Sequence, residues 1–194
     1  MECVGRLTRL HAFFYGVFTP AALKWGLSTG CPVFALDTLF LLAYTLDLRL
    51  DLSLSTWDEL LETVDACVLD ERRLGRGEVA GRLRARHHRQ SPLLGGGVAL
   101  MNVEIRHLRR SRLLYLRTCT PVSLGPQQEA ADIFVQLAAY PVSLRDRSLL
   151  EYLRNQLPQR PFLQELRACT SSATVQAMIE RWLAPLGSGW LEPH

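Results

Sequence analysis

The chain has 194 residues, of which 48% are hydrophobic and 21% are charged, as expected for one globular domain with or without an appendage. The net charge of +3 comes mainly from arginine, since Lys24 is the only lysine. This balance argues against a nucleic-acid-binding protein, which usually has a concentrated basic face. The five cysteines are odd in number and show no Cys-x-x-Cys spacing, which favours reduced thiols in the cytoplasm and no metal site.

Residues 11–46 are unusually apolar. Their apolar runs are shorter than the ~20 residues that cross a bilayer, and they are interrupted by Pro20, Lys24, Pro32 and Asp37. We therefore predict that residues 1–45 form an apolar, helical extension that packs against protein. Membrane association through residues 11–46, at the inner face of the membrane, is the alternative.

The next part of the chain predicts one strand and two helices. Leucines alternate with polar residues from Leu46 to Leu54, which predicts a half-buried strand with a solvated face. Thr56 followed by Glu59 is a capping-box pattern for a helix that runs to about Cys67. After a break at residues 75–77, residues 78–88 predict a second helix.

The end of this second helix is basic, with Arg82, Arg84, Arg86, His87, His88 and Arg89 close together. One interpretation is a solvated helix end, because cations near a helix C-terminus are favoured by the macrodipole. The other is a basic rim around a site for an anion or an acidic partner.

The remaining elements predict an α/β fold. Strands are expected at 98–105, 113–119 and 132–139, a loop at 121–128, and helices at 144–156, 162–168 and 172–186. This order predicts a mixed β-sheet flanked by helices over residues 46–187, followed by a tail at 188–194.

Three consecutive glycines, Gly95, Gly96 and Gly97, precede the strand at 98–105. Glycine adopts positive φ and lets another group approach the backbone closely. The loop is therefore either a tight turn or part of a phosphate-handling site.

The stretch around this loop resembles the active-site signature of enzyme IIA domains of the mannitol, fructose and nitrogen-regulatory type in the bacterial phosphotransferase system. That signature has an Arg-Glu pair, then Ser-Thr-Gly-Ile-Gly-x-Gly-Val-Ala-Ile-Pro-His, and its last His carries the phosphoryl group. Its Arg, its Ser and two of its glycines correspond to Arg86, Ser91, Gly95 and Gly97. Val98, Ala99 and Leu100 follow in register, but Met101-Asn102 replaces Pro-His. The resemblance implies the mannitol-type IIA sandwich fold.

The replacement removes the phosphorylatable group. The amide nitrogen of Asn102 is conjugated to its carbonyl and is a very poor nucleophile, whereas imidazole has an available lone pair. The second active-site His of the family corresponds to Asp146. We expect Asp146 to lie beside the cleft with Asn102 and Arg86, and to pair with Arg145, Arg147 or Arg86.

These residues lead to one main hypothesis and two alternatives. The main hypothesis is a non-catalytic regulatory or interaction domain that binds a protein partner, either a transporter or a phosphotransferase component, without a cofactor. The first alternative is an active phosphotransferase that uses His107, although an odd separation from Asn102 places it on the other face of the strand. The second is a small-anion sensor built from Arg86, Ser91, the glycine-loop amides and Asn102. The sequence makes no prediction about the oligomeric state.

Overall fold

The computed structural model describes residues 44–69, 71 and 74–188. The predicted extension at 1–45 lies outside these residues except for Tyr44 and Thr45, and so do residues 189–194 of the predicted tail. A mixed five-stranded sheet has the strand order β1-β4-β5-β3-β2, as the sequence predicted for the fold class. The strands are β1 (Tyr44–Leu52), β2 (Leu93–Gly95), β3 (Val98–Ile105), β4 (Ser111–Gly125) and β5 (Gln128–Ala139).

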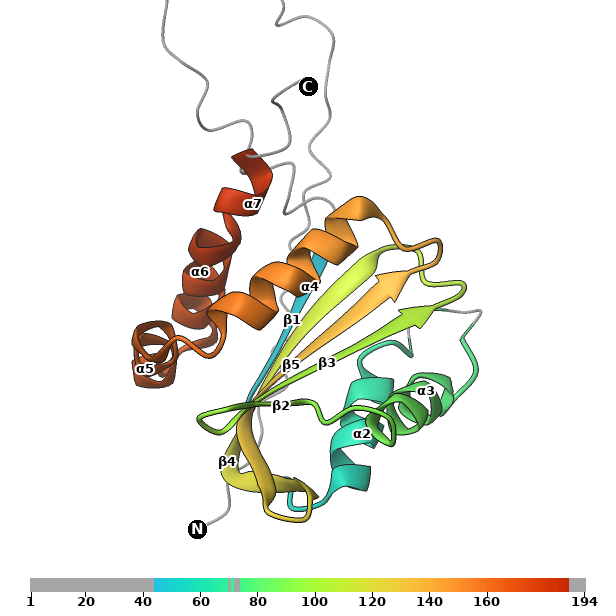
Figure 1. Ribbon diagram of the computed structural model, residues 1–194, viewed down its shortest axis with the longest axis horizontal. Helices are drawn as coiled ribbons and strands as arrows, with labels where there is room; N and C mark the ends of the chain where they lie inside the picture. Colours follow the sequence, from blue (N-terminus) through green and yellow to red (C-terminus); the bar gives the residue numbers. More distant parts are fainter. Residues whose placement is uncertain (1–43, 70, 72–73, 189–194) are drawn as a thin grey trace, which may run out of the picture.

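Helices cover both faces of this sheet (Figure 1). One face carries α2 (Trp57–Ala66) and α3 (Glu78–His87). The other carries α4 (Leu144–Gln156), α5 (Arg160–Ala168) and α6 (Ser172–Leu183), with the short α7 (Pro185–Ser188) after them. No helix in the described part of the chain is long and apolar enough to cross a membrane.

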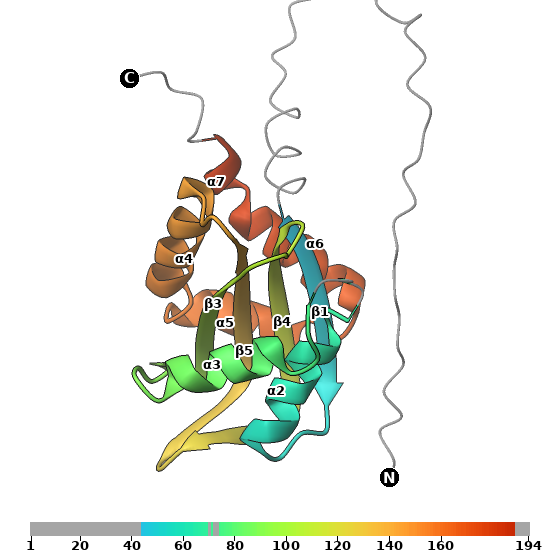
Figure 2. The same ribbon diagram turned by 90° about the vertical axis from the view of Figure 1, so that its right-hand side faces the viewer.

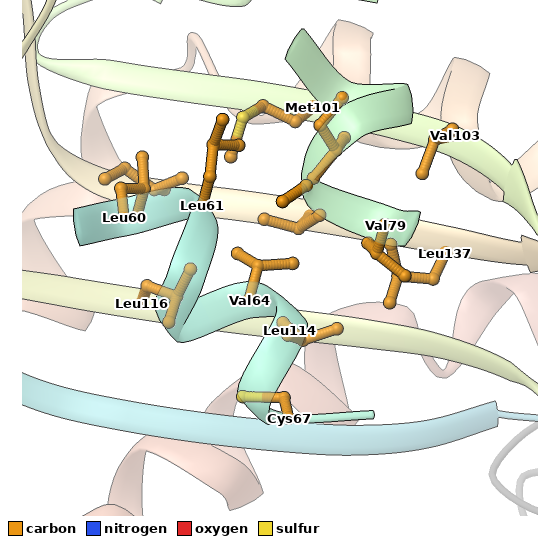
Figure 3. Packing of buried hydrophobic residues seen from close by; sticks show 14 of the residues in the cluster. Leu60, Leu61, Val64, Cys67, Val79, Met101, Val103, Leu114, Leu116 and Leu137 are labelled. Carbon is orange, nitrogen blue, oxygen red and sulfur yellow. The ribbon is translucent and has the colours of Figure 1, made fainter. Parts of the chain in front are cut away.

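Each face has its own hydrophobic cluster. Figure 3 shows the first cluster, in which Leu60, Leu61 and Val64 of α2 face the strands. All three side chains are fully buried, and burial of each stabilises the fold by about 1.5–3 kcal/mol. The second cluster packs α4, α5 and α6 against the opposite face. Neighbouring side chains of β3 point to opposite faces of the sheet, so that Met101 belongs to the first cluster and Leu100 to the second.

The predicted capping box is present at the start of α2. The Glu59 N–H donates to the Thr56 hydroxyl at 3.2 Å, and the Glu59 carboxylate accepts the Thr56 N–H at 3.2 Å. The cap of α3 was not predicted. Its N-cap is Gly77, and the Asp65 carboxylate from α2 accepts the Gly77 N–H at 2.6 Å and the Val79 N–H at 3.2 Å. Asp65 thereby fixes α3 to α2.

The prediction that β1 has one buried and one solvated face is only partly correct. Leu46, Leu48 and Leu50 pack on the second cluster, whereas Leu52 and Leu54 pack on the first. The leucines change from one face of the sheet to the other where the pairing of β1 with β4 shifts register, at a segment that includes Asp51, whose φ is 57°. The polar side of the strand is also partly covered, because Asp47 pairs with the buried Arg112, which in turn pairs with the buried Glu71.

The predicted loop at residues 121–128 is wrong. β4 continues to Gly125 and β5 begins at Gln128, so that a long hairpin ends in a two-residue turn. Pro121 disfavours a central strand locally, but it falls where the pairing register shifts, a place where strands tolerate proline. The hairpin is long because its end is apolar: Val122 and Ala130 are fully buried against the first cluster. Its tip lies below α2 and α3 in Figure 2.

Candidate functional site

The glycine loop turns the chain back so that β2 pairs antiparallel with the beginning of β3. Gly95, Gly96 and Gly97 all have positive φ, of 103°, 61° and 77°. This conformation costs a residue with a side chain about 1–2 kcal/mol, which explains the three glycines. Because β2 is short, it pairs only with Val98 and Ala99. Among the described residues, no further strand pairs with this edge of β3.

The backbone of β3 shows which of its groups face the open edge. Gly97 and Ile105 direct their carbonyls to the β5 side, where they accept N–H groups at 3.0 Å and 3.1 Å. On the opposite side, the Leu100 N–H donates to the Pro92 carbonyl at 2.8 Å, and the Glu104 carbonyl accepts from Arg82 at 3.5 Å. Backbone groups alternate in direction along a strand. The N–H and carbonyl of Asn102 therefore face the open edge.

A cavity of about 50 Å³ lies at this edge. We call it the Asn102 cavity, and its lining includes Arg86, His87, Ser91, Leu100, Asn102 and Arg154. It brings together the end of α3, the segment before β2, the middle of β3 and the second half of α4. Three of the predicted site residues, Arg86, Ser91 and Asn102, thus line one cavity.

Hydrogen-bond donors predominate in this cavity. Arg86 and Arg154 make no ion pair with any described residue, and the Asn102 amide has no hydrogen-bond partner among them. The Ser91 hydroxyl, in contrast, donates to Gln128 at 2.8 Å and accepts the Leu93 N–H at 3.2 Å. The cavity therefore offers unpaired positive charge and amide groups to an incoming acceptor.

His87 forms one wall of the cavity, a position that the sequence did not reveal. Its ring packs on Trp57 at 4.5 Å, and its Nε2 lies 2.6 Å from the Leu124 carbonyl. Because a carbonyl only accepts, Nε2 must carry the hydrogen. The Nδ1 atom is buried and has no hydrogen-bond partner in the described part of the chain. Neither ring nitrogen is thus exposed in the cavity.

Asp146 does not line the Asn102 cavity, contrary to prediction. It is buried at the third position of α4, where it forms a capping box with Ser143. Its carboxylate accepts the Tyr44 hydroxyl at 2.6 Å, and it makes none of the predicted ion pairs among the described residues. Burial alone would raise the pKa of Asp146, but hydrogen bonds from Ser111, Ser143 and Tyr44 hold it below its usual value. Its role is to begin α4.

His107 also lies away from the cavity. β3 ends at Ile105, so His107 belongs to the exposed turn before β4, with a φ of 70°. The prediction that it lies on the opposite face of the strand is wrong because the strand ends before it.

A second polar group contacts the glycine loop. We call Tyr115, Asp132 and Arg167 the Asp132 cluster. Asp132 is 1% exposed and accepts the Tyr115 hydroxyl and the Arg167 Nε–H, each at 2.6 Å. Arg167 also donates to the Gly96 carbonyl at 2.9 Å. Burial, reinforced by the charge of Asp132, raises the pKa of Tyr115. The cluster therefore ties the glycine loop to α5.

A larger, open cavity of about 520 Å³ borders the same loop and is lined by Gly95, Gly96, Leu163 and Arg167. Its only charged lining residue, Arg167, is already paired with Asp132. The described residues contain no group of three or more His, Cys, Asp or Glu side chains placed to hold a metal ion. The Asn102 cavity is therefore the stronger candidate site.

Comparisons with solved structures place this arrangement among known folds. Nitrogen regulatory protein IIA-Ntr from Neisseria meningitidis aligns with 73% of this chain and 99% of its own, at a TM-score of 0.64 and 21% identity. IIA mannitol from Escherichia coli aligns with 69% of this chain and 95% of its own, at a TM-score of 0.56 and 14% identity. No family model and no curated protein matches the sequence. The chain thus has the fold of the IIA domains of the phosphotransferase system.

Proposed function

We propose that this protein is a non-catalytic IIA-like regulatory domain that binds a protein partner without accepting a phosphoryl group. The observation that carries the proposal is Asn102, which lies in a cavity at the open edge of β3 together with Arg86 and Ser91. The cavity retains hydrogen-bond donors but has no nucleophile at that position. The partner that we propose is a transporter or another phosphotransferase-type component in the cytoplasm.

The histidines near the cavity support this proposal. Phosphoryl transfer needs a nucleophile that is held in line with the donor phosphate. His87 lines the cavity, but its Nε2 is bonded to a carbonyl and its Nδ1 is buried. His107 is in an exposed turn and does not line the cavity. An active phosphotransferase would therefore need a rearrangement to present an imidazole.

A small-anion sensor is a second candidate, favoured by Arg86 and Arg154. Both guanidinium groups line the same cavity and neither is paired with a described carboxylate. A bound anion would relieve the repulsion between two like charges at one site. Titration with inorganic phosphate, followed by the amide signals of Asn102 and Ser91, which line the cavity, would detect such binding.

The main proposal is tested by incubation with a radiolabelled phosphohistidine carrier protein. We expect no acid-labile label on the unmodified chain, whereas a IIA domain that has the signature histidine at the position of Asn102 serves as the positive control. Rapid stoichiometric labelling would contradict the proposal. The variants His87→Ala and His107→Ala would then identify which imidazole accepts the phosphoryl group.

A further inference from the structure

We propose that the open edge of β3 is a docking site for an extended, acidic segment of the partner protein. The segment adds as a strand beside β3 and places a carboxylate in the Asn102 cavity. This inference rests on the proposed partner-binding function and names the chemistry of the partner.

The first argument is the direction of the backbone groups. The N–H and carbonyl of Asn102 face outward, as does the N–H of Glu104, by the same alternation that pairs Leu100 with Pro92. Among the described residues, these outward groups make one hydrogen bond, from Arg82 to the Glu104 carbonyl at the long distance of 3.5 Å. Unpaired strand edges are templates for a further strand, and several domain families bind extended peptides in this way.

The second argument is charge. Arg86 and Arg154 project from α3 and α4, on opposite faces of the sheet, and both line the cavity at the same edge. Neither is paired with a described carboxylate. Guanidinium groups bind carboxylates through paired hydrogen bonds. A strand that adds to this edge would therefore be favoured if it carried an acidic residue opposite Asn102.

The third argument is the size of the cavity. Binding sites for drug-sized ligands usually have volumes of about 300–1,000 Å³. The Asn102 cavity has about 50 Å³. That volume accommodates the end of one side chain, so the rest of the ligand must lie along the surface. A peptide strand that follows the edge of β3 meets this requirement.

The test measures binding of a labelled peptide to the 194-residue chain. The peptide alternates valine and threonine and carries two glutamates near one end; a matched peptide has glutamines in their place. We expect the acidic peptide to bind at least about tenfold more tightly than the glutamine peptide, because hydrogen bonds to charged groups are stronger than those to neutral ones. The double variant Arg86→Ala/Arg154→Ala should abolish this preference without abolishing folding.

Amide exchange measured by NMR gives a readout that is specific for strand addition. Peptide binding should slow exchange at Asn102 and Glu104, whose N–H groups face outward, and leave Met101 and Val103 unchanged. The variant Glu104→Pro removes one outward N–H and should weaken binding, whereas Glu104→Ala keeps it and should not. If Glu104→Pro fails to fold, the alternating protection in the unmodified protein decides the question.

The proposal is overturned if both peptides bind equally, if neither binds, or if protection does not alternate along β3. These results leave the non-catalytic function standing, with its partner on another surface. Labelling by a phosphohistidine carrier would instead overturn the proposed function, so the two failures are distinguishable.

Discussion

The Asp132 cluster and the Asn102 cavity differ in how their polar groups are satisfied. The Asp132 cluster joins a carboxylate, a phenol and a guanidinium through two hydrogen bonds of 2.6 Å. The Asn102 cavity, in contrast, holds Arg86 and Arg154 without a described carboxylate partner. The protein thus contains one polar group of side chains that is satisfied internally and one that is not.

This difference distinguishes structural from binding chemistry. A buried polar group costs stability unless it is hydrogen-bonded, so a network that is closed on itself serves the fold. Donors that remain unpaired at a surface cavity contribute little to folding and are available to a ligand. The comparison therefore predicts that substitutions in the Asp132 cluster affect stability, whereas substitutions in the Asn102 cavity affect binding.

The largest effect is expected for Asp132→Ala. The change leaves the buried Tyr115 hydroxyl without its acceptor and removes the partner of Arg167. Loss of one member of a buried pair costs about 3–5 kcal/mol, and the partial exposure of Arg167 places the expected loss near the lower value. Urea denaturation measures it.

Asp58→Ala is the matched control for this prediction, because Asp58 pairs with Arg84 at 2.6 Å but is 71% exposed. Exposed ion pairs contribute at most about 1 kcal/mol. Equal losses for Asp132→Ala and Asp58→Ala would show that the Asp132 cluster is not a structural network.

The second prediction concerns the loop that joins the two regions. Gly96→Ala should cost about 1–2 kcal/mol, because φ is positive there although no atom crowds the added methyl group. Gly97→Ala should cost more, since its methyl group would also meet Arg167 at 3.4 Å. Gly81→Ala, in the open interior of α3, should instead stabilise the protein by about 1 kcal/mol. Thermal denaturation of the three variants gives the order.

The third prediction concerns Asp146, whose hydrogen bonds serve the fold, as those of the Asp132 cluster do. Its folded-state pKa is below the ordinary 3.8, so the stability that it contributes is present above that value. This stability is lost as the pH falls through the folded-state pKa. Asp146→Asn should cost about 1 kcal/mol at neutral pH, as for loss of a helix cap. The loss should shrink below about pH 4, and unfolding curves across this range measure it. A constant loss would exclude an ionic contribution.

Much of the fold was predictable because its signals are local. The capping box of Thr56 and Glu59, the glycine loop and the apolar run of β3 each depend on a few adjacent residues. The α/β class and the IIA fold followed from their order and from the motif. The hairpin of β4 and β5 was missed because Pro121 indicates a break locally, whereas burial of Val122 against α2 and α3 is a tertiary effect.

The site was predictable only in part, for a related reason. Arg86, Ser91 and Asn102 lie within one short stretch, so the motif located all three. Arg154 comes from a distant helix and carries no local signal of its role. Asp146 was assigned to the cleft by a motif position, but its position as the third residue of α4 explains its carboxylate as a cap. A helix N-terminus and an active site both favour acidic residues, and the sequence alone does not separate them.

The smallest effect is expected for Arg86→Ala/Arg154→Ala, which tests the other half of the comparison. Both side chains are exposed and neither has an ion-pair partner among the described residues. Removing them breaks no hydrogen bond or ion pair among the described residues. We therefore expect the free energy of unfolding to change by at most about 0.5 kcal/mol, as for other surface substitutions. The preference for the acidic peptide over its glutamine match should nevertheless be lost. If urea denaturation shows a loss comparable to that of Asp132→Ala, the two arginines serve the fold, and the distinction between the Asp132 cluster and the Asn102 cavity fails.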